Sequence, residues 1–517
     1  MNIKNMTLDE KLGMVLCARR FEEEDMEFIL ELVRKRALGS VQGHAADPGP
    51  LHKILAEADY PIIVVNDAEQ GFPTTKLPQI PLNALSACNN PEYCRAFAKG
   101  IVNDAKNAGF NATWGPVIDI LDCDGPIKVG RTFSDDKERV TDLAEIICSV
   151  FADNNYLACG KHFPGSYGLD IDTHMREGVC EFSKEYIIEH NLYPYIKLNE
   201  KGLLPTAMVG HTVYKNLDPD YPASISKKTI DIIRELGFDG VMYTDSFGMM
   251  GILQKFGEEN IYGMAIAAGN DIILPNYRTP FKKCFELLKK NFEDGMFSEE
   301  RLDEAVRRVL KAQGIVGANP QNPTVFTEED RKMLENVARD CITAVTDGRP
   351  AALDKESKKL FVIMTENIFE QPQGYNAEFA VLPWYYPEKI ADRIRENFPG
   401  AGVEFIPEFS NWNDHERVLS RAIAYDEVVA ITFCNTKCYM GTDGLTRRAE
   451  SWINALSYSD KISAVVHFGN PYALKNIKNV PRRIFGYTIP DSQLHAMDVL
   501  AGKTEARGKI PFDIDFD

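Results

Sequence analysis

Val241-Met242-Tyr243-Thr244-Asp245 is a short apolar run that ends in a carboxylate. A continuous run of this kind predicts a strand that is buried on both faces, as in a parallel sheet. The first three hundred residues or so repeat the pattern: an apolar run, a polar residue, then a helical segment. The other runs are Ile62-Ile63-Val64-Val65, Leu157-Ala158-Cys159-Gly160, Thr206-Ala207-Met208-Val209 and Asn270-Asp271-Ile272-Ile273-Leu274.

The segments between these runs carry helix start and stop signals. Ser226 is a suitable N-cap for a helix that ends before Gly237, and Ser298 for another, with Gly314 following its last turn. Alternating strand and helix over about 300 residues matches the size of a (β/α)8 barrel. We therefore predict an α/β protein whose residues 1–318 form a TIM-like barrel. A doubly wound open sheet is the alternative.

The remainder of the chain predicts a second, smaller domain. Residues 315–323 are rich in Pro, Gly and Asn, which indicates a boundary, and residues 319–340 are expected to be a linker with a connecting helix. Beyond it the alternation resumes, with predicted strands at 360–364, 428–433, 462–468 and 484–487. So few strands favour a three-layer α/β sandwich over a second barrel, and we assign it to residues 341–517.

Charge and composition exclude several classes of function. The formal net charge is −18 and no basic tract stands out, which argues against a nucleic-acid partner. Apolar residues never run long enough to span a membrane, and the N-terminus lacks a signal-peptide core. The 11 cysteines are scattered singly, and the closest pair, Cys434 and Cys438, has no partners for a zinc site. We predict no metal, no cofactor and a cytoplasmic location; a mature secreted form is the alternative.

Polar residues follow four of the apolar runs. Asp67, Lys161, His211 and Asp245 each lie at the expected carboxyl end of a strand or just beyond it. A TIM barrel places its functional residues at that end of its strands. These four side chains are therefore candidates for one site.

Asp172 and His174 form a second candidate group. One residue separates them, so in an extended loop both side chains point to the same side. An Asp that hydrogen-bonds an imidazole fixes its tautomer and stabilises the imidazolium, as an acid/base histidine requires. Taken alone, such a tripeptide is also common in polar surface loops.

Several motifs, in this order, resemble glycoside hydrolase family 3, specifically its β-N-acetylhexosaminidase branch. The similarity extends over nearly the whole chain, and one stretch departs from the family pattern: Ser166-Tyr167-Gly168-Leu169 replaces the usual residues after Pro-Gly. The matching motifs are Asp67-Ala68-Glu69-Gln70-Gly71, Gly130-Arg131-Thr132-Phe133, Lys161-His162-Phe163-Pro164-Gly165 with Asp172-Thr173-His174 at the family spacing, and Gly237-Phe238-Asp239-Gly240 leading to Asp245.

The resemblance implies a role for each matching residue. Asp245 would attack the anomeric carbon, which gives a covalent glycosyl-enzyme intermediate and retention of configuration. His174 would protonate the leaving oxygen and then deprotonate water, with Asp172 orienting it. The residues implied to hold the sugar are Asp67, Arg131, Lys161, His162 and His211.

The resemblance leaves more than one function open. Exo-acting removal of terminal β-linked N-acetylglucosamine (GlcNAc) is the first. Phosphorolysis is the second, because a histidine does not repel a phosphate dianion as a carboxylate base does. Hydrolysis of another β-glycoside, such as a glucoside or xyloside, is the third, and a non-catalytic sugar-binding protein is the fourth. The loop at 166–169, which departs from the family pattern, is expected to affect which aglycone the protein accepts.

Overall fold

The computed structural model describes residues 3–19, 23–43, 47–73, 77–121, 130–165, 169, 171–321, 323–365, 385–434 and 444–516. The chain divides into two compact units. Unit 1 comprises residues 1–77, 94–123 and 136–331, and unit 2 comprises residues 78–93, 124–135 and 332–517. Two short segments of the N-terminal half therefore pack with the C-terminal unit.

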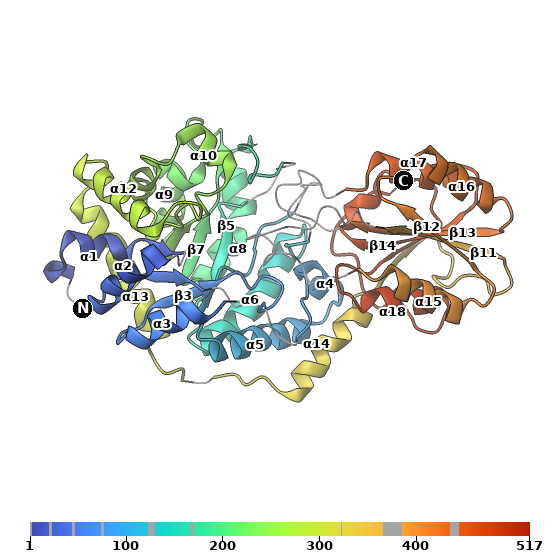
Figure 1. Ribbon diagram of the computed structural model, residues 1–517, viewed down its shortest axis with the longest axis horizontal. Coiled ribbons are helices and arrows are strands. Elements are labelled where there is room, and N and C mark those ends of the chain that lie inside the picture. Colours follow the sequence, from blue (N-terminus) through green and yellow to red (C-terminus); the bar gives the residue numbers. More distant parts are fainter. Residues whose placement is uncertain are drawn as a thin grey trace. The chain divides into compact units, whose positions relative to one another are not determined.

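Unit 1 is built on short parallel strands, with helices around them (Figure 1). One sheet has the order β1-β2-β3-β4 and another the order β5-β7-β9, and every neighbouring pair in them is parallel. Strands β6 and β8 form a separate parallel pair. These strands are β1 (Cys17–Ala18), β2 (Ser40–Gln42), β3 (Ile63–Asn66), β4 (Ala112–Thr113), β5 (Cys159–Phe163), β6 (Gly178–Cys180), β7 (Thr206–Val209), β8 (Thr212–Tyr214) and β9 (Val241–Thr244).

Single parallel bridges extend the hydrogen bonding between these sheets. Ala112 of β4 bridges to Leu157, just before β5. Tyr243 of β9 bridges to Ile272, and Ile273 bridges to Leu16, just before β1. The predicted strand at 270–274 is thus present only as bridged residues.

The helices of unit 1 follow the strands in sequence. Their positions reflect the predicted caps: the Ser226 side chain accepts from Thr229 N–H at the start of α9, and Ser298 accepts from Arg301 N–H at the start of α13. The helices are α1 (Leu8–Met14), α2 (Glu23–Arg34), α3 (Gly49–Glu57), α5 (Pro91–Asn107), α6 (Lys137–Asp153), α7 (Lys184–Tyr186), α8 (Tyr193–Glu200), α9 (Lys227–Glu235), α10 (Met250–Phe256), α11 (Ile261–Ala268), α12 (Phe281–Glu293) and α13 (Glu299–Val316).

One predicted helix end is wrong. Helix α13 does not stop before Gly314 but continues to Val316. A helical glycine costs about 1 kcal/mol relative to alanine, which tertiary contacts can offset. Here the buried Gln313 side chain donates to the carbonyl oxygens of Leu38 and Gly39, so the last turn is anchored.

Unit 2 contains a six-stranded sheet of order β10-β15-β14-β13-β11-β12, in which only β10 is antiparallel to its neighbour. Helices α15 and α18 lie on one face of the sheet, and α16 and α17 on the other (Figure 1). The strands are β10 (Thr343–Thr346), β11 (Lys359–Thr365), β12 (Gly402–Pro407), β13 (Glu427–Cys434), β14 (Ile462–Gly469) and β15 (Arg482–Phe485). The helices are α4 (Leu82–Ala87), α14 (Glu328–Asp340, which enters the unit), α15 (Pro387–Asn397), α16 (Trp412–Ala422), α17 (Arg447–Tyr458) and α18 (Ser492–Leu500).

In the part of the chain that the structure describes, no helix is both long and apolar enough to cross a membrane.

Candidate active site

Asp245 directly follows β9 and is the centre of a group of histidines. Its backbone N–H donates to Val209 O at 2.8 Å, and its Oδ1 accepts from Ser246 N–H at 2.7 Å. Burial raises the pKa of this carboxyl, but the nearby imidazoles of His162, His211 and His174 outweigh that effect and lower the pKa to about 2. The carboxylate is therefore ionised at neutral pH and lies near three histidines.

His174 and Asp172 form a hydrogen-bonded pair. Asp172 Oδ1 lies 2.9 Å from His174 Nδ1 and also accepts from His174 N–H at 2.8 Å. The sequence predicted that the two side chains meet in an extended loop, and the structure differs. The tripeptide forms a tight turn, in which Asp172 O accepts from Met175 N–H and Arg176 N–H. The aspartate side chain bonds the backbone two residues on, as in an Asx turn. The side chains meet because the backbone turns.

This turn is attached to the start of α10. Met250 N–H donates to His174 O at 3.0 Å. A Cβ on Gly251 would lie 2.4 Å from Thr173 O, so only glycine permits this close approach. The His174 turn is thereby fixed to the segment that follows Asp245. Residues 166–168 of the departing loop lie outside the described residues.

Lys161, near the end of β5, is almost completely buried between two carboxylates. Its Nζ lies 2.7 Å from Asp67 Oδ1, just beyond β3, and also pairs with Glu69. The Lys161 side chain is 2% exposed, whereas that of Asp67 is 51% exposed. The lysine therefore holds Asp67 in place while leaving that carboxylate accessible.

His162 is the next residue, and Asp119 holds it. The pairing of β5 with β7 is irregular between Lys161 and Phe163, so His162 is an additional residue in its strand. Bulges of this kind re-aim a side chain near functional sites. The buried Asp119 accepts from His162 N–H at 2.9 Å and lies 2.8 Å from His162 Nδ1. The carboxylate binds Nδ1–H, so Asp119 fixes the orientation of the ring.

His211 follows β7 and is buried. Its Nδ1 lies 2.8 Å from Ser224 Oγ, and its Nε2 lies 3.0 Å from Ser246 O. Burial lowers the pKa of His211, and the charge of Asp245 opposes that shift. The ring also stacks on Phe247 with centroids 5.4 Å apart. The predicted contact of His211 with sugar stays a prediction, since both ring nitrogens already contact protein atoms.

Arg131 is the one predicted residue outside this group. It lies in the segment 124–135, which packs with unit 2, and is described with that unit. The structure thus brings together the other seven predicted site residues, all in unit 1.

Sequence reasoning missed the residues that hold the predicted ones. They are Glu69, Asp119, Ser224 and Ser246, which contact Lys161, His162, His211 and Asp245 respectively. Arg19, which in turn contacts Ser246, was missed as well. Only Glu69 carried a signal, since it stands in the quoted motif with Asp67. The described residues contain no group of three or more potential ligands placed to hold a metal ion.

The structure thus places an ionised carboxylate, a His–Asp pair and a buried lysine in one α/β unit, and these are side-chain types that nucleophilic and acid/base chemistry uses. Residues 51–312 match the model of the glycosyl hydrolase family 3 N-terminal domain. The chain belongs to glycosyl hydrolase family 3, and the predicted resemblance is confirmed.

Curated relatives carry related names. A β-N-acetylglucosaminidase/β-glucosidase of Cellulomonas fimi is 28% identical over 335 residues, which cover 61% of this chain and 59% of that protein. A β-hexosaminidase of Nitrosomonas eutropha is 29% identical over 231 residues, which cover 41% of this chain and 64% of that protein. The chain thus spans less than two thirds of the length of these relatives.

Solved structures share the fold over nearly the whole chain. A glycoside hydrolase family 3 β-N-acetylglucosaminidase from Paenibacillus sp. str. FPU-7 superposes with a TM-score of 0.81 at 22% identity, covering 99% of this chain and 100% of that one. The β-glucoside phosphorylase BglX also gives a TM-score of 0.81, at 20% identity, with 99% and 94% covered.

Proposed function

We propose that this protein is a retaining, exo-acting β-N-acetylhexosaminidase that removes terminal β-linked GlcNAc. The observation that carries the proposal is the ionised Asp245 beside the His174–Asp172 pair in a family 3 chain. The choice of sugar draws on the relatives, whose names refer to β-hexosaminidase and β-N-acetylglucosaminidase activity.

Asp245 is the proposed nucleophile. Its low pKa keeps it charged, as attack on the anomeric carbon and stabilisation of an oxocarbenium-like transition state require. Attack forms the bond from the carboxylate oxygen to the anomeric carbon and breaks the bond to the leaving oxygen. Water then attacks the same carbon and releases Asp245 with net retention of configuration.

His174 is the proposed acid/base. Asp172 accepts the Nδ1 hydrogen, so the exchangeable proton is carried on Nε2. In the first step Nε2–H gives its proton to the leaving oxygen, and in the second Nε2 takes a proton from the attacking water. Asp172 stabilises the imidazolium through both steps.

The sugar hydroxyls are proposed to bind Asp67, Arg131, Lys161 and His162. Support comes from the accessible Asp67 carboxylate on the buried Lys161 and from the His162 ring that Asp119 orients near Asp245. His211, also assigned to the sugar from sequence, is proposed to contribute from behind the site, since its ring nitrogens contact Ser224 and Ser246. The mechanism needs no cofactor and no metal.

We also propose that residues 1–318 form a closed (β/α)8 barrel, followed by a linker at 319–340 and an α/β sandwich at 341–517. The parallel bridges from β4 to Leu157, from β9 to Ile272 and from Ile273 to Leu16 support closure. A barrel explains why Asp67, Lys161 and Asp245, far apart in sequence, meet at strand ends.

Phosphorolysis is the second candidate, with phosphate as the partner that replaces water. The acid/base is a histidine, which is neutral when it must accept a phosphate dianion, so no second negative charge opposes the acceptor. A β-glucoside phosphorylase is among the proteins that share the fold.

A cytoplasmic location is proposed on the basis of the cysteines. The nine described cysteines are all free, and seven of them are buried. Free buried thiols are typical of proteins kept in a reducing compartment.

The proposed function is tested by turnover of aryl β-glycosides of GlcNAc, glucose and xylose, each with and without millimolar phosphate, with products identified. Free GlcNAc whose rate of release is independent of phosphate is the expected result. GlcNAc-1-phosphate would establish phosphorolysis instead. Activity confined to glucose or xylose would overturn the choice of sugar.

A further inference from the structure

Ser246 is bonded to the protein through each of its polar groups. Its N–H donates to Asp245 Oδ1 at 2.7 Å, and its carbonyl oxygen lies 3.0 Å from His211 Nε2. Its Oγ accepts from Arg19 Nη1 at 2.6 Å and from Gly248 N–H at 3.2 Å. The residue next to the proposed nucleophile is thus held from two sides.

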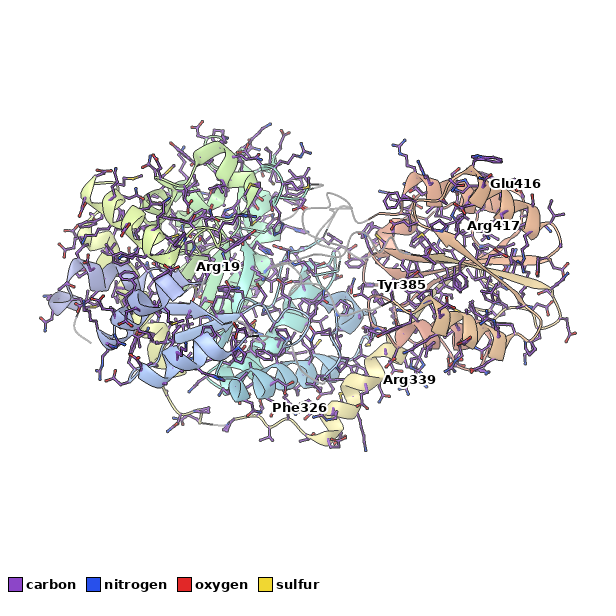
Figure 2. All side chains as sticks on the ribbon, viewed as in Figure 1. Arg19, Phe326, Arg339, Tyr385, Glu416 and Arg417 are labelled. Atoms are coloured by element: carbon purple, nitrogen blue, oxygen red, sulfur yellow. The ribbon has the colours of Figure 1, made fainter. Side chains whose placement is uncertain are left out.

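Arg19 holds Ser246 from one side, through the contact of its Nη1 with Ser246 Oγ. It directly follows β1 and belongs to unit 1 (Figure 2). Its Nε donates to Gln42 Oε1 at 2.6 Å, and its Nη1 also donates to Pro275 O at 3.2 Å. Its guanidinium carbon lies 6.0 Å from the ring centroid of Trp114 and 5.6 Å from that of Tyr277. These contacts fix the position of the guanidinium that donates to Ser246 Oγ.

His211 holds the other side of Ser246. A carbonyl oxygen only accepts, so the Nε2 that faces Ser246 O carries the hydrogen, and Nδ1 accepts from Ser224 Oγ–H. This assignment describes a neutral ring with one defined tautomer, which agrees with its burial. The ring acts as a fixed donor to the carbonyl oxygen of Ser246.

We propose that Arg19 and His211 are positioning residues that clamp Ser246 and, through its N–H, hold the Asp245 carboxylate in the orientation needed for attack. The inference rests on the proposed function of Asp245. A nucleophile must approach the anomeric carbon within a narrow range of distance and angle, so a small displacement costs rate more than affinity. Asp245 Oδ1 is occupied by Ser246, which leaves Oδ2 for the sugar.

A double-mutant cycle with Arg19→Met and Ser246→Ala tests the clamp on the glycoside that the wild type cleaves fastest. Each single variant is expected to lower kcat by about ten- to a hundredfold, with KM changed less than about threefold. Because both changes break the same contact, the double variant is expected to lose little more than the worse single variant. Losses that multiply, or that fall on KM alone, would overturn the proposal.

Two further variants separate positioning from folding. Arg19→Lys keeps a donor and a charge near Ser246 and is expected to recover at least about tenfold of the kcat lost in Arg19→Met. Ser457→Ala removes a buried hydroxyl of unit 2, bonded to Asn479 O at 3.2 Å, and is expected to leave kcat unchanged. An Arg19→Lys variant no better than Arg19→Met would contradict the clamp.

A crystallographic readout distinguishes failure of this inference from failure of the proposed function. Wild-type protein that cleaves none of the three glycosides would contradict the function. Whether or not the wild type is active, crystals of Arg19→Met are expected to show a displaced Asp245 carboxylate. The side chain should either rotate away from Ser246 N–H or occupy more than one rotamer. An unchanged single rotamer would overturn the clamp.

Discussion

His174 Nδ1 and Asp172 Oδ1 lie 2.9 Å apart, and the same carboxylate oxygen also accepts from the backbone N–H of His174 at 2.8 Å. One oxygen therefore fixes both the ring and the peptide of the proposed acid/base. The Asp172 side chain is 1% exposed and that of His174 is 22% exposed, so the ring edge reaches the site from a buried anchor.

Replacing this histidine should separate substrates by leaving group. We expect His174→Ala to lower kcat/KM on an N-acetylglucosaminide with a poor alkyl leaving group by about a hundred- to a thousandfold. The loss on p-nitrophenyl β-GlcNAc should be below about tenfold, because that leaving group needs no proton. Steady-state kinetics on both substrates measures the ratio. Equal losses would argue against an acid/base role.

The Asp245→Asn variant removes the proposed nucleophile with almost no change in shape. We expect kcat to fall by about three orders of magnitude or more on every glycoside. Ser246 N–H can still donate to the amide oxygen of the new side chain, so thermal unfolding should show a folded protein. Asp231→Asn, on the exposed face of α9 and paired with Lys227, is the matched control and should retain full activity. Turnover of Asp245→Asn near that of the control would exclude the assignment.

Asp119 is expected to act on sugar binding through His162. In Asp119→Asn the amide oxygen can accept only one of the two hydrogens that the carboxylate now accepts, from His162 N and Nδ1. The ring then loses its fixed orientation, and kcat/KM should fall by about ten- to a hundredfold. Isothermal binding of GlcNAc to the Asp119→Asn variant, compared with wild type, checks this; unchanged affinity and unchanged kcat/KM would refute it.

Stability in acid should depend on His467, which is buried in β14 of unit 2. Burial lowers the pKa of His467 from 6.5 to about 3, a shift that a hydrogen bond with Asn470 opposes. Because the folded pKa is depressed, the unfolded chain takes up the proton first as pH falls. The free energy of unfolding should therefore fall by about 1.4 kcal/mol per pH unit below about pH 6.5, down to the folded pKa.

The corresponding variant is His467→Gln, which cannot titrate. Urea unfolding at pH 7, 6 and 5 should show a shallower decrease in the free energy of unfolding for this variant than for wild type. The decrease that remains comes from the other titrating groups, which both proteins share. Identical decreases in the two proteins would contradict the assignment.

The sequence predicted the strands that are continuous apolar runs. The runs at 206–209 and 241–244 coincide with β7 and β9, and the run at 462–468 lies within β14. The strand β12 was missed because its residues alternate between buried and partly exposed, so no apolar run marks it. The two-residue strands β1 and β4 are too short to give any periodic signal.

Side chains that support the site were harder to predict. Asp67, Lys161 and Asp245 stand at strand ends, where the pattern itself points to them. Arg19 and Asp119 act only by contact with Ser246 and His162, which lie more than forty residues away in sequence. Contacts of this range arise from how the strands pack, and a single sequence carries no local pattern for them.

The central claim is that Asp245 performs a retaining displacement at the anomeric carbon of a β-N-acetylglucosaminide. Proton NMR recorded during the first minutes of hydrolysis of p-nitrophenyl β-GlcNAc tests it most directly, because the two anomers of the released sugar give separate signals before mutarotation mixes them. The account predicts that β-GlcNAc appears first and the α anomer later. Release of the α anomer first would show inversion and contradict a glycosyl-enzyme intermediate at Asp245.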